Sequence, residues 1–397
     1  MFPSRILLVE PTTFIHTPHH IQAALHSTGF ENARFTLLTA TRNELYRERL
    51  RTLAAEHANL SLRLLDNSHL PNGKRLATLR QHHFTLKAAE TLLAEESFDL
   101  VAYLMADHIL PFFSHPLADR FFPAHRAAGG ISGLLFNHNG LRPAEGQRWK
   151  QTLKAALERQ ILSRAVRGGW FRRLAFFDHR CTGEARRKID PTLFVDGVDP
   201  IELQTVDQTE ARRRLNLPVD GRVALMFGAI SGRKAIDETL DILSREAAPQ
   251  GPRITLLIGG PVDPPVRPRL EAALARARER FDIVFHDGFV PDCDLPLFFA
   301  SADFVVCAYR NFLASSGTLL HAAAFGKPAM VSAGGVMEDA VARFGCGEVV
   351  RFSDPSHFAE RFFALARADG QALEAYRQGA RHYAETMDAR RYMAQFL

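Results

Sequence analysis

Short apolar runs alternate with longer amphipathic stretches along almost the whole chain, and this alternation limits the possible folds more than any other feature. In the first half, strand-like runs occupy residues 5–9, 35–38, 60–65, 98–104, 131–136 and 173–177. Helical patterns separate these runs, for example at 43–56 and 79–95. Strands that alternate with helices in this way predict βαβ units and a parallel sheet.

The alternation starts again after about residue 200. Further strand-like runs occupy residues 223–227, 254–258, 283–285, 304–307 and 329–331. The segment 196–200 carries turn residues and a proline, which is typical of a domain boundary. We therefore predict an α/β protein with two Rossmann-like domains, 1–200 and 201–375, whose parallel sheets face a central cleft. A helical tail at 376–397 is expected to pack back on the N-terminal domain.

The composition is that of an ordinary globular protein. Of the 397 residues, 46% are hydrophobic and 23% are charged, which excludes a disordered or fibrous chain. No apolar run approaches the roughly 20 residues that span a bilayer, and the first run is too short for a signal peptide. The four cysteines lie far apart without metal-type spacing, so we expect a cytoplasmic protein with no disulfide and no metal site.

Positive charge is concentrated in one stretch. Residues 145–188 hold 12 basic and 4 acidic residues, whereas the whole chain has a net charge of only +5. Trp149, Leu153 and Leu157 recur there at near-helical spacing. This pattern predicts either a helix at an anionic membrane surface, peripheral to the inner face, or a helix packed on its own sheet with an arginine-rich outer face. No nucleic-acid reading motif accompanies the charge, so no nucleic-acid partner is expected.

Two segments of the second half favour an anionic ligand. A buried strand ends at Gly228, and Arg233 and Lys234 then open a helix, where free backbone N–H groups already favour an anion. This arrangement predicts a diphosphate site, although an ordinary strand–helix turn with two solvated cations would have the same sequence. The second segment, 314–318, contains only small residues before another helix, so that a ligand can approach the backbone closely; alternatively its hydroxyl side chains cap that helix.

Segment 223–350 resembles the nucleotide-sugar-binding domain of GT-B glycosyltransferases of the glycosyl transferases group 1 (family 4) type. Four motifs in order carry the resemblance: Gly228 with Lys234, the strand and glycine turn at 256–261, the segment 288–303, and the helix and turn at 316–335. The N-terminal 200 residues resemble the family only in their alternation of strands and helices.

The resemblance implies a GT-B glycosyltransferase that moves a sugar from a nucleotide-diphosphate sugar to a hydroxyl acceptor. It implies no metal and no other cofactor, and a role in the synthesis of cell-surface polysaccharide, glycolipid or another glycoconjugate, with a glycan, a lipid-linked sugar or a protein as acceptor. The residues implied to bind the donor are Gly228, Arg233, Lys234, Phe289, Val290, Tyr309, Ala314, Ser315, Ser316, Gly317, Thr318 and His321.

The chain departs from the family pattern at three positions. Ala229 stands where the family usually has an arginine, and Leu313 and His321 stand where it has a pair of glutamates. Leu313 has no side-chain hydrogen-bonding group, whereas His321 can still bind a ribose hydroxyl. The family implies retention of configuration, but these departures leave inversion open.

Polar residues after the N-terminal strands are candidates for the acceptor side. Asp107 and His108 follow the strand-like run at 98–104, and His16 follows the first strand. A carboxylate or imidazole there can take the acceptor proton, so we predict these three as catalytic residues. The alternative for Asp107 is a helix N-cap. The segment 137–140 is a further polar edge.

Three other functions fit parts of this pattern. A catalytically inactive member would bind a nucleotide sugar as a sensor or scaffold, without turnover. A sugar-nucleotide epimerase needs acid–base groups on both sides of the sugar ring, which the missing glutamates do not favour. A phosphorylase of this fold needs a lysine for pyridoxal phosphate, and no segment suggests one.

Overall fold

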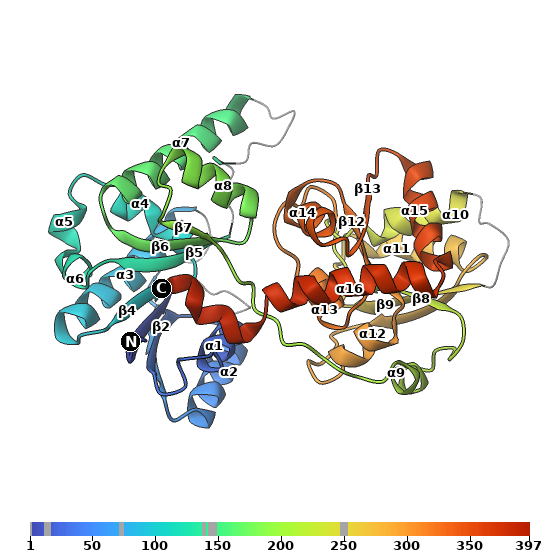
Figure 1. Ribbon diagram of the computed structural model, residues 1–397, viewed down its shortest axis with the longest axis horizontal. Helices are drawn as coiled ribbons and strands as arrows, with labels where there is room; N and C mark the ends of the chain where they lie inside the picture. Colours follow the sequence, from blue (N-terminus) through green and yellow to red (C-terminus); the bar gives the residue numbers. More distant parts are fainter. Residues whose placement is uncertain (1, 12–16, 71–74, 137–139, 142–148, 247–252) are drawn as a thin grey trace. The chain divides into compact units, whose positions relative to one another are not determined.

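Two parallel sheets organise the chain, as the alternation predicts. The structure, a computed structural model, describes residues 2–11, 17–70, 75–136, 140–141, 149–246 and 253–397. The chain divides into a first unit, Met1–Pro200 with Ala389–Leu397, and a second unit, Ile201–Asp388 (Figure 1). The predicted α/β class with two Rossmann-like domains is confirmed.

The first unit contains a seven-stranded parallel sheet with the order β3-β2-β1-β4-β5-β6-β7. Its strands are β1 (Arg5–Glu10), β2 (Arg34–Ala40), β3 (Leu60–Leu65), β4 (Leu100–Tyr103), β5 (Ile131–Leu135), β6 (Phe171–Phe176) and β7 (Phe194–Asp196). Its helices are α1 (Thr17–Leu25), α2 (Glu44–Glu56), α3 (Arg75–Glu95), η1 (Ala106–His108), α4 (Leu110–Phe113), α5 (Ala118–Phe121), α6 (Pro123–Ala127), α7 (Trp149–Arg167), α8 (His179–Lys188) and η2 (Ala389–Phe396).

The second unit contains a six-stranded parallel sheet with the order β10-β9-β8-β11-β12-β13. Its strands are β8 (Arg222–Phe227), β9 (Ile254–Gly260), β10 (Asp282–Asp287), β11 (Phe304–Cys307), β12 (Ala329–Ser332) and β13 (Gly347–Val350). Its helices are α9 (Gln208–Arg214), α10 (Ile236–Arg245), α11 (Arg267–Ala277), α12 (Leu295–Ser301), α13 (Gly317–Ala324), α14 (Gly335–Phe344), α15 (Pro355–Arg367) and α16 (Gly370–Thr386).

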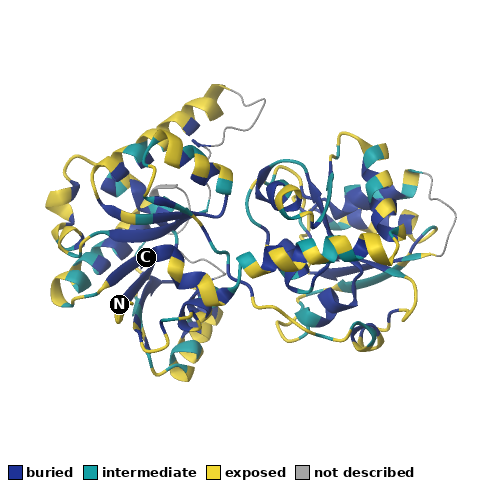
Figure 2. Ribbon diagram, in the orientation of Figure 1, coloured by how far each residue is buried: buried dark blue, intermediate teal, exposed yellow. Residues whose placement is uncertain are grey.

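The central strands of each sheet are buried on both faces, which explains why strands such as β4 and β11 are almost wholly apolar. In β1, Leu7 and Val9 pack into one core, whereas Ile6 and Leu8 pack into the core on the opposite face. This division follows from the two-residue period of a strand. Figure 2 shows the strands as buried and the outer faces of the helices as exposed. None of the helices in the described part of the chain combines the length and hydropathy needed to cross a bilayer.

The C-terminal segment returns to the first unit, but it begins at Ala389 rather than at residue 376. Helix α16 continues to Thr386 and belongs to the second unit. The last nine residues pack on the first sheet: the hydroxyl of Ser132 donates to the carbonyl of Phe396 at 2.7 Å, and Tyr392 lies 3.0 Å from the imidazole of His20. Both aromatic rings are fully buried.

A buried ion pair anchors the second sheet to α9. The guanidinium of Arg212 donates to Asp303 at 2.8 Å, and both side chains are almost fully buried. The same carboxylate oxygen accepts the N–H of Val223 at the start of β8, and Arg212 also donates to the carbonyl of Ser301. The pair therefore joins α9, β8 and the entry to β11.

We expect Asp303→Ala to lower the free energy of unfolding of the second unit by about 3–5 kcal/mol, because it leaves a buried guanidinium without its carboxylate. Urea unfolding of the full chain, followed by circular dichroism, measures the effect. The matched control is Asp282→Ala, which breaks an exposed pair with Arg253 and should cost less than about 1 kcal/mol. Equal effects of both substitutions would contradict the structural role of the buried pair.

Candidate functional site

A buried lysine lies at the carboxyl end of β8, where the chain turns into α10. Lys234 is 7% exposed. Its ammonium donates to the carbonyl of Phe227 at 2.5 Å, to the hydroxyl of Tyr309 at 2.9 Å and to that of Thr318 at 3.0 Å. All three acceptors are neutral, and no ion pair between described residues includes Lys234. The ammonium is therefore buried with hydrogen-bond partners but without a counter-charge.

This environment destabilises the charged form of the lysine. The pKa of Lys234 is lowered to about 8, mainly by burial; Cys307 acts in the opposite direction, and the neighbouring charge of Arg233 adds a smaller lowering. A buried cation is normally paired, because desolvation of a lone charge is costly. An anion at this point would supply the missing charge, so the site is built to attract one.

Two glycines allow the backbone to close around the lysine. Gly228 has a φ of +98°, and a Cβ atom there would lie 2.9 Å from the Lys234 ammonium. Gly260, with a φ of +142°, approaches the Gly228 carbonyl so closely that a Cβ would come within 2.3 Å of its oxygen. The glycines of two separate motifs therefore serve one purpose, which is to pack the ends of β8 and β9 together beneath the site.

Tyr309 links Lys234 to the start of α13. Its ring is buried, its hydroxyl accepts from Lys234, and the hydroxyl of Ser316 donates to it at 3.3 Å. Ser316 occupies the N-cap position of α13, but its side chain makes no capping hydrogen bond. The predicted alternative, in which Ser316 caps the helix through its side chain, is therefore wrong. The N-terminus of α13 instead meets the buried lysine, which adds a second group that favours an anion.

Arg233 is exposed and is held beside this cluster by two aromatic rings. Its guanidinium lies 4.6 Å from the ring centre of Phe312 and 5.5 Å from that of Tyr309. The N–H of Arg310 also donates to the Arg233 carbonyl at 2.8 Å. The sequence analysis missed Phe312, because only the folded chain brings it to Arg233, 79 positions away.

The structure brings most of the predicted donor residues together. Gly228, Arg233, Lys234, Tyr309, Ser316 and Thr318 are joined by direct contacts, and Ala314, Ser315 and Gly317 lie in the same loop and first helical turn. Phe289 is 77% exposed, whereas Val290 packs against a hydrophobic core. No hydrogen bond, ion pair or ring contact between described residues joins either one to the cluster. They stay predictions.

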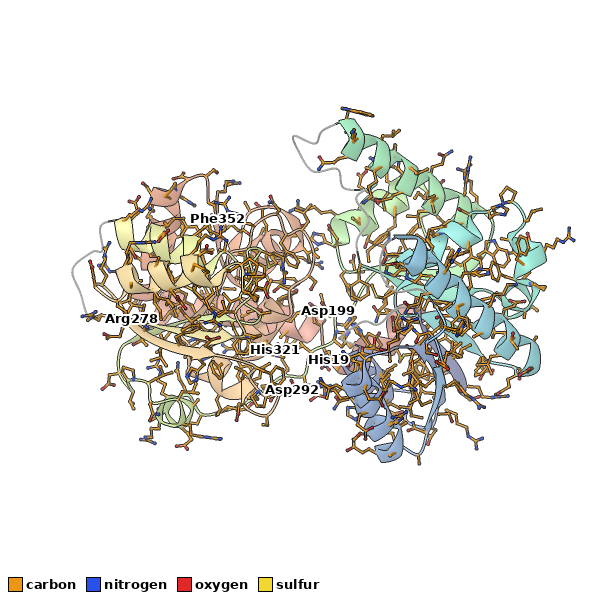
Figure 3. All side chains as sticks on the ribbon, turned by 180° about the vertical axis from the view of Figure 1, so that it is seen from behind. His19, Asp199, Arg278, Asp292, His321 and Phe352 are labelled. Atoms are coloured by element: carbon orange, nitrogen blue, oxygen red, sulfur yellow. The ribbon has the colours of Figure 1, made fainter. Side chains whose placement is uncertain are left out.

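His321 lies one turn into α13 and is half-buried (Figure 3). Its ring lies 5.3 Å from that of Phe299. Leu313, at the other position where the resembling family has a glutamate, is 38% exposed. Its carbonyl accepts from the N–H of Val336, and a Cβ on Gly335 would lie 2.5 Å from the Leu313 Cα. The backbone of this loop is therefore tightly held, while the side chain offers no polar group.

In the first unit, Asp107 and His108 lie in η1, directly after β4. One oxygen of Asp107 accepts the N–H of Phe136 at 2.8 Å, at the end of β5. Asp107 does not cap the following helix, since α4 has Ile109 at its N-cap without a side-chain bond. The N-cap alternative is therefore wrong. His16 and residues 137–139 lie outside the described residues.

His108 packs against a second histidine that the sequence analysis missed. The two rings, of His108 and His82, lie 4.3 Å apart, and His82 is 3% exposed on α3. Burial lowers the pKa of both, that of His82 to about 4. Both imidazoles are therefore neutral at pH 7. The only sequence signal was a histidine within a long helical pattern, which is equally typical of a helix surface.

The lysine environment predicts a stability gain on its removal. Between about pH 8 and pH 10.5, the unfolded lysine binds more protons than the folded one. The buried charge therefore lowers the free energy of unfolding most below pH 8, and this effect fades as the pH rises through that range. We therefore expect Lys234→Met to raise the free energy of unfolding of the ligand-free protein at pH 7, on the order of 1–3 kcal/mol, and less at pH 10.

Urea unfolding at the two pH values measures this difference. The exposed Lys154→Met substitution is the control and should show no such pH dependence. A loss of stability at pH 7 that does not change with pH would show that the three hydrogen bonds of Lys234 outweigh the burial of its charge.

Comparison with known proteins supports a family assignment for the second unit. Residues 207–383 match the family described as Glycosyl transferases group 1. A D-inositol 3-phosphate glycosyltransferase of Thermobispora bispora is 28% identical over 258 residues, which are 62% of this chain and 58% of that protein. The match thus covers less than two thirds of the relative's length.

Solved structures extend the similarity to both units. HepE of Anabaena, in complex with UDP and glucose, has a TM-score of 0.67 at 14% identity, over 99% of this chain and 98% of that one. WaaG, a glycosyltransferase involved in lipopolysaccharide biosynthesis, has a TM-score of 0.64 at 14% identity, over 98% and 97% of the two chains. The resemblance stated from the sequence is thereby confirmed: residues 207–383 match the Glycosyl transferases group 1 family, and the chain as a whole has the fold of the GT-B glycosyltransferases.

Proposed function

We propose that this chain is a glycosyltransferase that moves a sugar from a nucleotide-diphosphate sugar to a hydroxyl acceptor. One observation carries the proposal: the Lys234 ammonium is buried without a counter-charge beside the N-terminus of a helix. A diphosphate would supply that counter-charge. A structural relative supports a nucleotide-sugar donor, since HepE of Anabaena was crystallised with UDP-glucose.

The proposed chemistry depends on charge at the leaving group. When the bond from the sugar to the diphosphate breaks, negative charge develops on the diphosphate oxygens. Lys234, Arg233 and the first N–H groups of α13 would stabilise that charge, and they are already oriented before the reaction begins. Because the protein itself supplies these positive groups, the proposed reaction does not require a metal ion.

The donor sugar and base would lie near the same loop. We assign His321 to a ribose hydroxyl, and Tyr309, Phe289 and Val290 to the region of the base and sugar. Leu313 gives the sugar no side-chain hydrogen bond, so the backbone of 314–318 would have to bind its hydroxyls. Both retention and inversion remain compatible with this arrangement.

On the acceptor side, His108 is a better proton acceptor than Asp107. One carboxylate oxygen of Asp107 already accepts the Phe136 N–H, which ties this side chain to the end of β5. The imidazole of His108 is neutral at pH 7, as a general base must be. Asp107 would then position the end of β4 relative to β5. His16 keeps its predicted place near the reacting carbon.

The four cysteines, Cys181, Cys293, Cys307 and Cys346, are free. Free thiols are typical of a reducing compartment, which supports the proposal of a cytoplasmic enzyme.

The acceptor would be a growing glycan, a lipid-linked sugar or a protein.

Leu313 favours one second candidate, a catalytically inactive protein that binds a nucleotide sugar. Both candidates predict nucleotide binding, and only the first predicts turnover. We expect one of the nucleotides UDP, GDP, dTDP, ADP and CMP to raise the melting temperature of the wild type more than the others do. At 100 times its Kd, a ligand stabilises the folded protein by about 2.7 kcal/mol. Lys234→Ala should lose this effect, whereas Lys154→Ala should keep it.

A thermal-shift panel measures this binding, and hydrolysis of the matching nucleotide sugar measures turnover. Binding without any hydrolysis or transfer would select the inactive protein. No shift with any nucleotide would contradict both candidates.

His108→Gln should reduce kcat about 10²–10⁴-fold, the usual contribution of a general base, without changing the nucleotide-induced shift in melting temperature. In the wild type, the acid limb of kcat should lie below pH 6.5, because burial lowers the pKa of His108. Steady-state kinetics against pH measure both effects, with the exposed His382→Gln as control. An unchanged kcat in His108→Gln would remove this residue from the mechanism.

A further inference from the structure

Helix α7 presents a row of large apolar side chains to solvent. Trp149 is 71% exposed, Leu153 64% and Leu157 55%. Residues four positions apart lie on one face of a helix, so the three form a continuous stripe over its first turns. The buried residues of α7, among them Leu162 and Ala165, lie on the opposite face and pack into the core of the first unit. The stripe therefore has no packing partner among the described residues of this unit.

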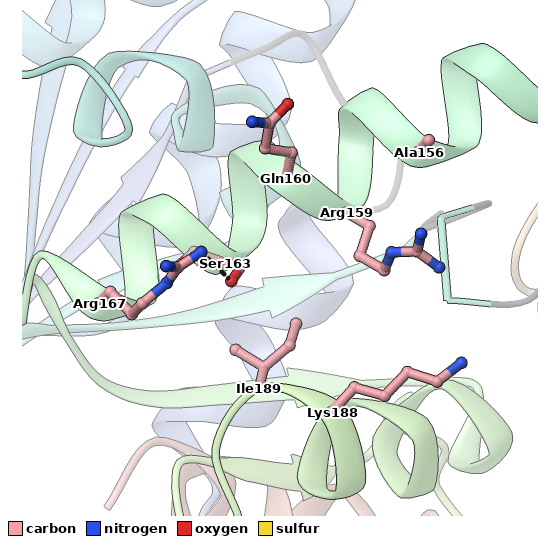
Figure 4. Close-up of a pocket in the computed structure, with 7 residues that line it drawn as sticks. All are labelled: Ala156, Arg159, Gln160, Ser163, Arg167, Lys188 and Ile189. Atoms are coloured by element: carbon pink, nitrogen blue, oxygen red, sulfur yellow. Dashed lines mark hydrogen bonds between the residues drawn. The ribbon is translucent and has the colours of Figure 1, made fainter.

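A basic pocket lies on the face of α7 next to the stripe, further along the helix. Its volume is about 340 Å³, and it opens between α7 and the C-terminal end of α8 (Figure 4). The residues that line it are Ala156, Arg159, Gln160, Ser163, Arg167, Lys188 and Ile189. Arg167 follows Trp149 by five turns of about 3.6 residues, so both point in the same direction from the helix axis.

The three cations of this pocket are only partly neutralised. Arg167 is held by Ser163, to whose hydroxyl it donates at 2.9 Å. Lys188 pairs with Glu184, which Arg187 also contacts. Arg159 forms no ion pair or hydrogen bond through its guanidinium with any described residue, and it reaches toward the same side of the pocket as Lys188 (Figure 4). The pocket therefore retains net positive charge and several N–H donors.

The surrounding surface is also positive. Between Trp149 and Arg167, α7 carries five basic residues and one acidic residue, Glu158, which pairs with Lys154. The second expectation from the sequence is confirmed: the inner face of the helix packs into the core of its own unit, and its outer face is rich in basic residues. The membrane contact stays a prediction. What the sequence could not show is that the cations of α7 meet Lys188 of α8 in one pocket beside the stripe.

A small anion as ligand would explain the basic pocket but not the apolar stripe. An acidic protein or a nucleic acid would explain the positive charge, but neither offers a hydrocarbon layer into which the stripe could insert. A phospholipid bilayer offers phosphate groups beside an apolar interior, and tryptophan favours that interface. We propose that the α7 surface, defined by Trp149, Leu153, Leu157, Arg159, Arg167 and Lys188, docks the protein on an anionic phospholipid bilayer. Arg159, Arg167 and Lys188 would bind a headgroup phosphate, and the stripe would enter the interface.

The docking is independent of the donor site and goes beyond the proposed transfer reaction. It would hold the first unit, which carries the acceptor-side candidates Asp107 and His108, at a surface where lipid-linked acceptors are found. Its place and chemistry involve the first unit alone.

The test uses the full chain with vesicles of phosphatidylcholine and with equimolar vesicles of phosphatidylcholine and phosphatidylglycerol. Trp149 is exposed and Trp170 is 3% exposed, so the fluorescence of Trp149 reports insertion. We expect co-sedimentation with the anionic vesicles and a blue shift of the emission, which Trp149→Phe abolishes. Weak or absent binding to pure phosphatidylcholine is expected as well.

The variant R159Q/R167Q/K188Q should bind the anionic vesicles about fivefold less for each cation removed, on the order of a hundredfold in total. Its matched control, R213Q/R214Q/R278Q, removes three exposed cations from the second unit and should bind like the wild type. The variant W149S/L153S/L157S should lose the binding while its circular dichroism is unchanged. In all variants the nucleotide-induced shift in melting temperature should persist, which separates this test from that of the proposed function.

Four results would overturn the docking proposal. The first two are a failure of the protein to sediment with anionic vesicles and equal binding to both vesicle types. The third is an equal loss of vesicle binding in the control variant R213Q/R214Q/R278Q. The fourth is a blue shift of the Trp149 emission that occurs without vesicles and depends on protein concentration. The last would assign the stripe to a second copy of the chain. Inorganic phosphate that stabilises the wild type but not R159Q/R167Q/K188Q, without vesicle binding, would assign the pocket to a small anion instead.

Discussion

The buried charge of Lys234 is the constraint around which the candidate site of the second unit is arranged. Its ammonium is enclosed by groups from β8, from the end of β11 and from α13, three segments that are far apart in the sequence. Gly228 leaves room for this ammonium, and Gly260 lets the end of β9 approach that of β8. A fold that holds a desolvated cation in place gives up stability, and such a loss is typical of a site prepared for a ligand of opposite charge.

The first unit shows a different use of charge. Its sheet is covered on both faces, yet α7 keeps a strongly positive and partly apolar outer face. The buried residues of this helix already secure its packing, so the exposed stripe contributes nothing to the core of the unit. A surface that is unnecessary for folding and unfavourable in water requires another explanation, and contact with a bilayer provides one.

The sequence predicted the architecture well because parallel sheets buried on both faces leave a simple pattern of apolar runs. It missed β7, which has only three residues, and β13, whose sequence Gly-Glu-Val-Val begins with a glycine and a charged residue and so contains no recognisable apolar run. It identified the segments that meet around Lys234, because a glycine turn followed by a lysine at the start of a helix is typical of an anion site. It missed Phe312 and His82, whose roles come from contacts with Arg233 and His108 across the fold.

The sequence by itself determined most of the strands and helices, the two domains and the motifs that surround Lys234, because these follow from local periodicity and from turn residues. Only the tertiary structure decided that Lys234 lacks a counter-charge, that Ser316 leaves α13 without a side-chain cap, and that the cations of α7 and α8 share a pocket. The reason is physical. Burial, ion pairing and the direction of a side chain depend on neighbours that are distant in sequence, and no local pattern contains them.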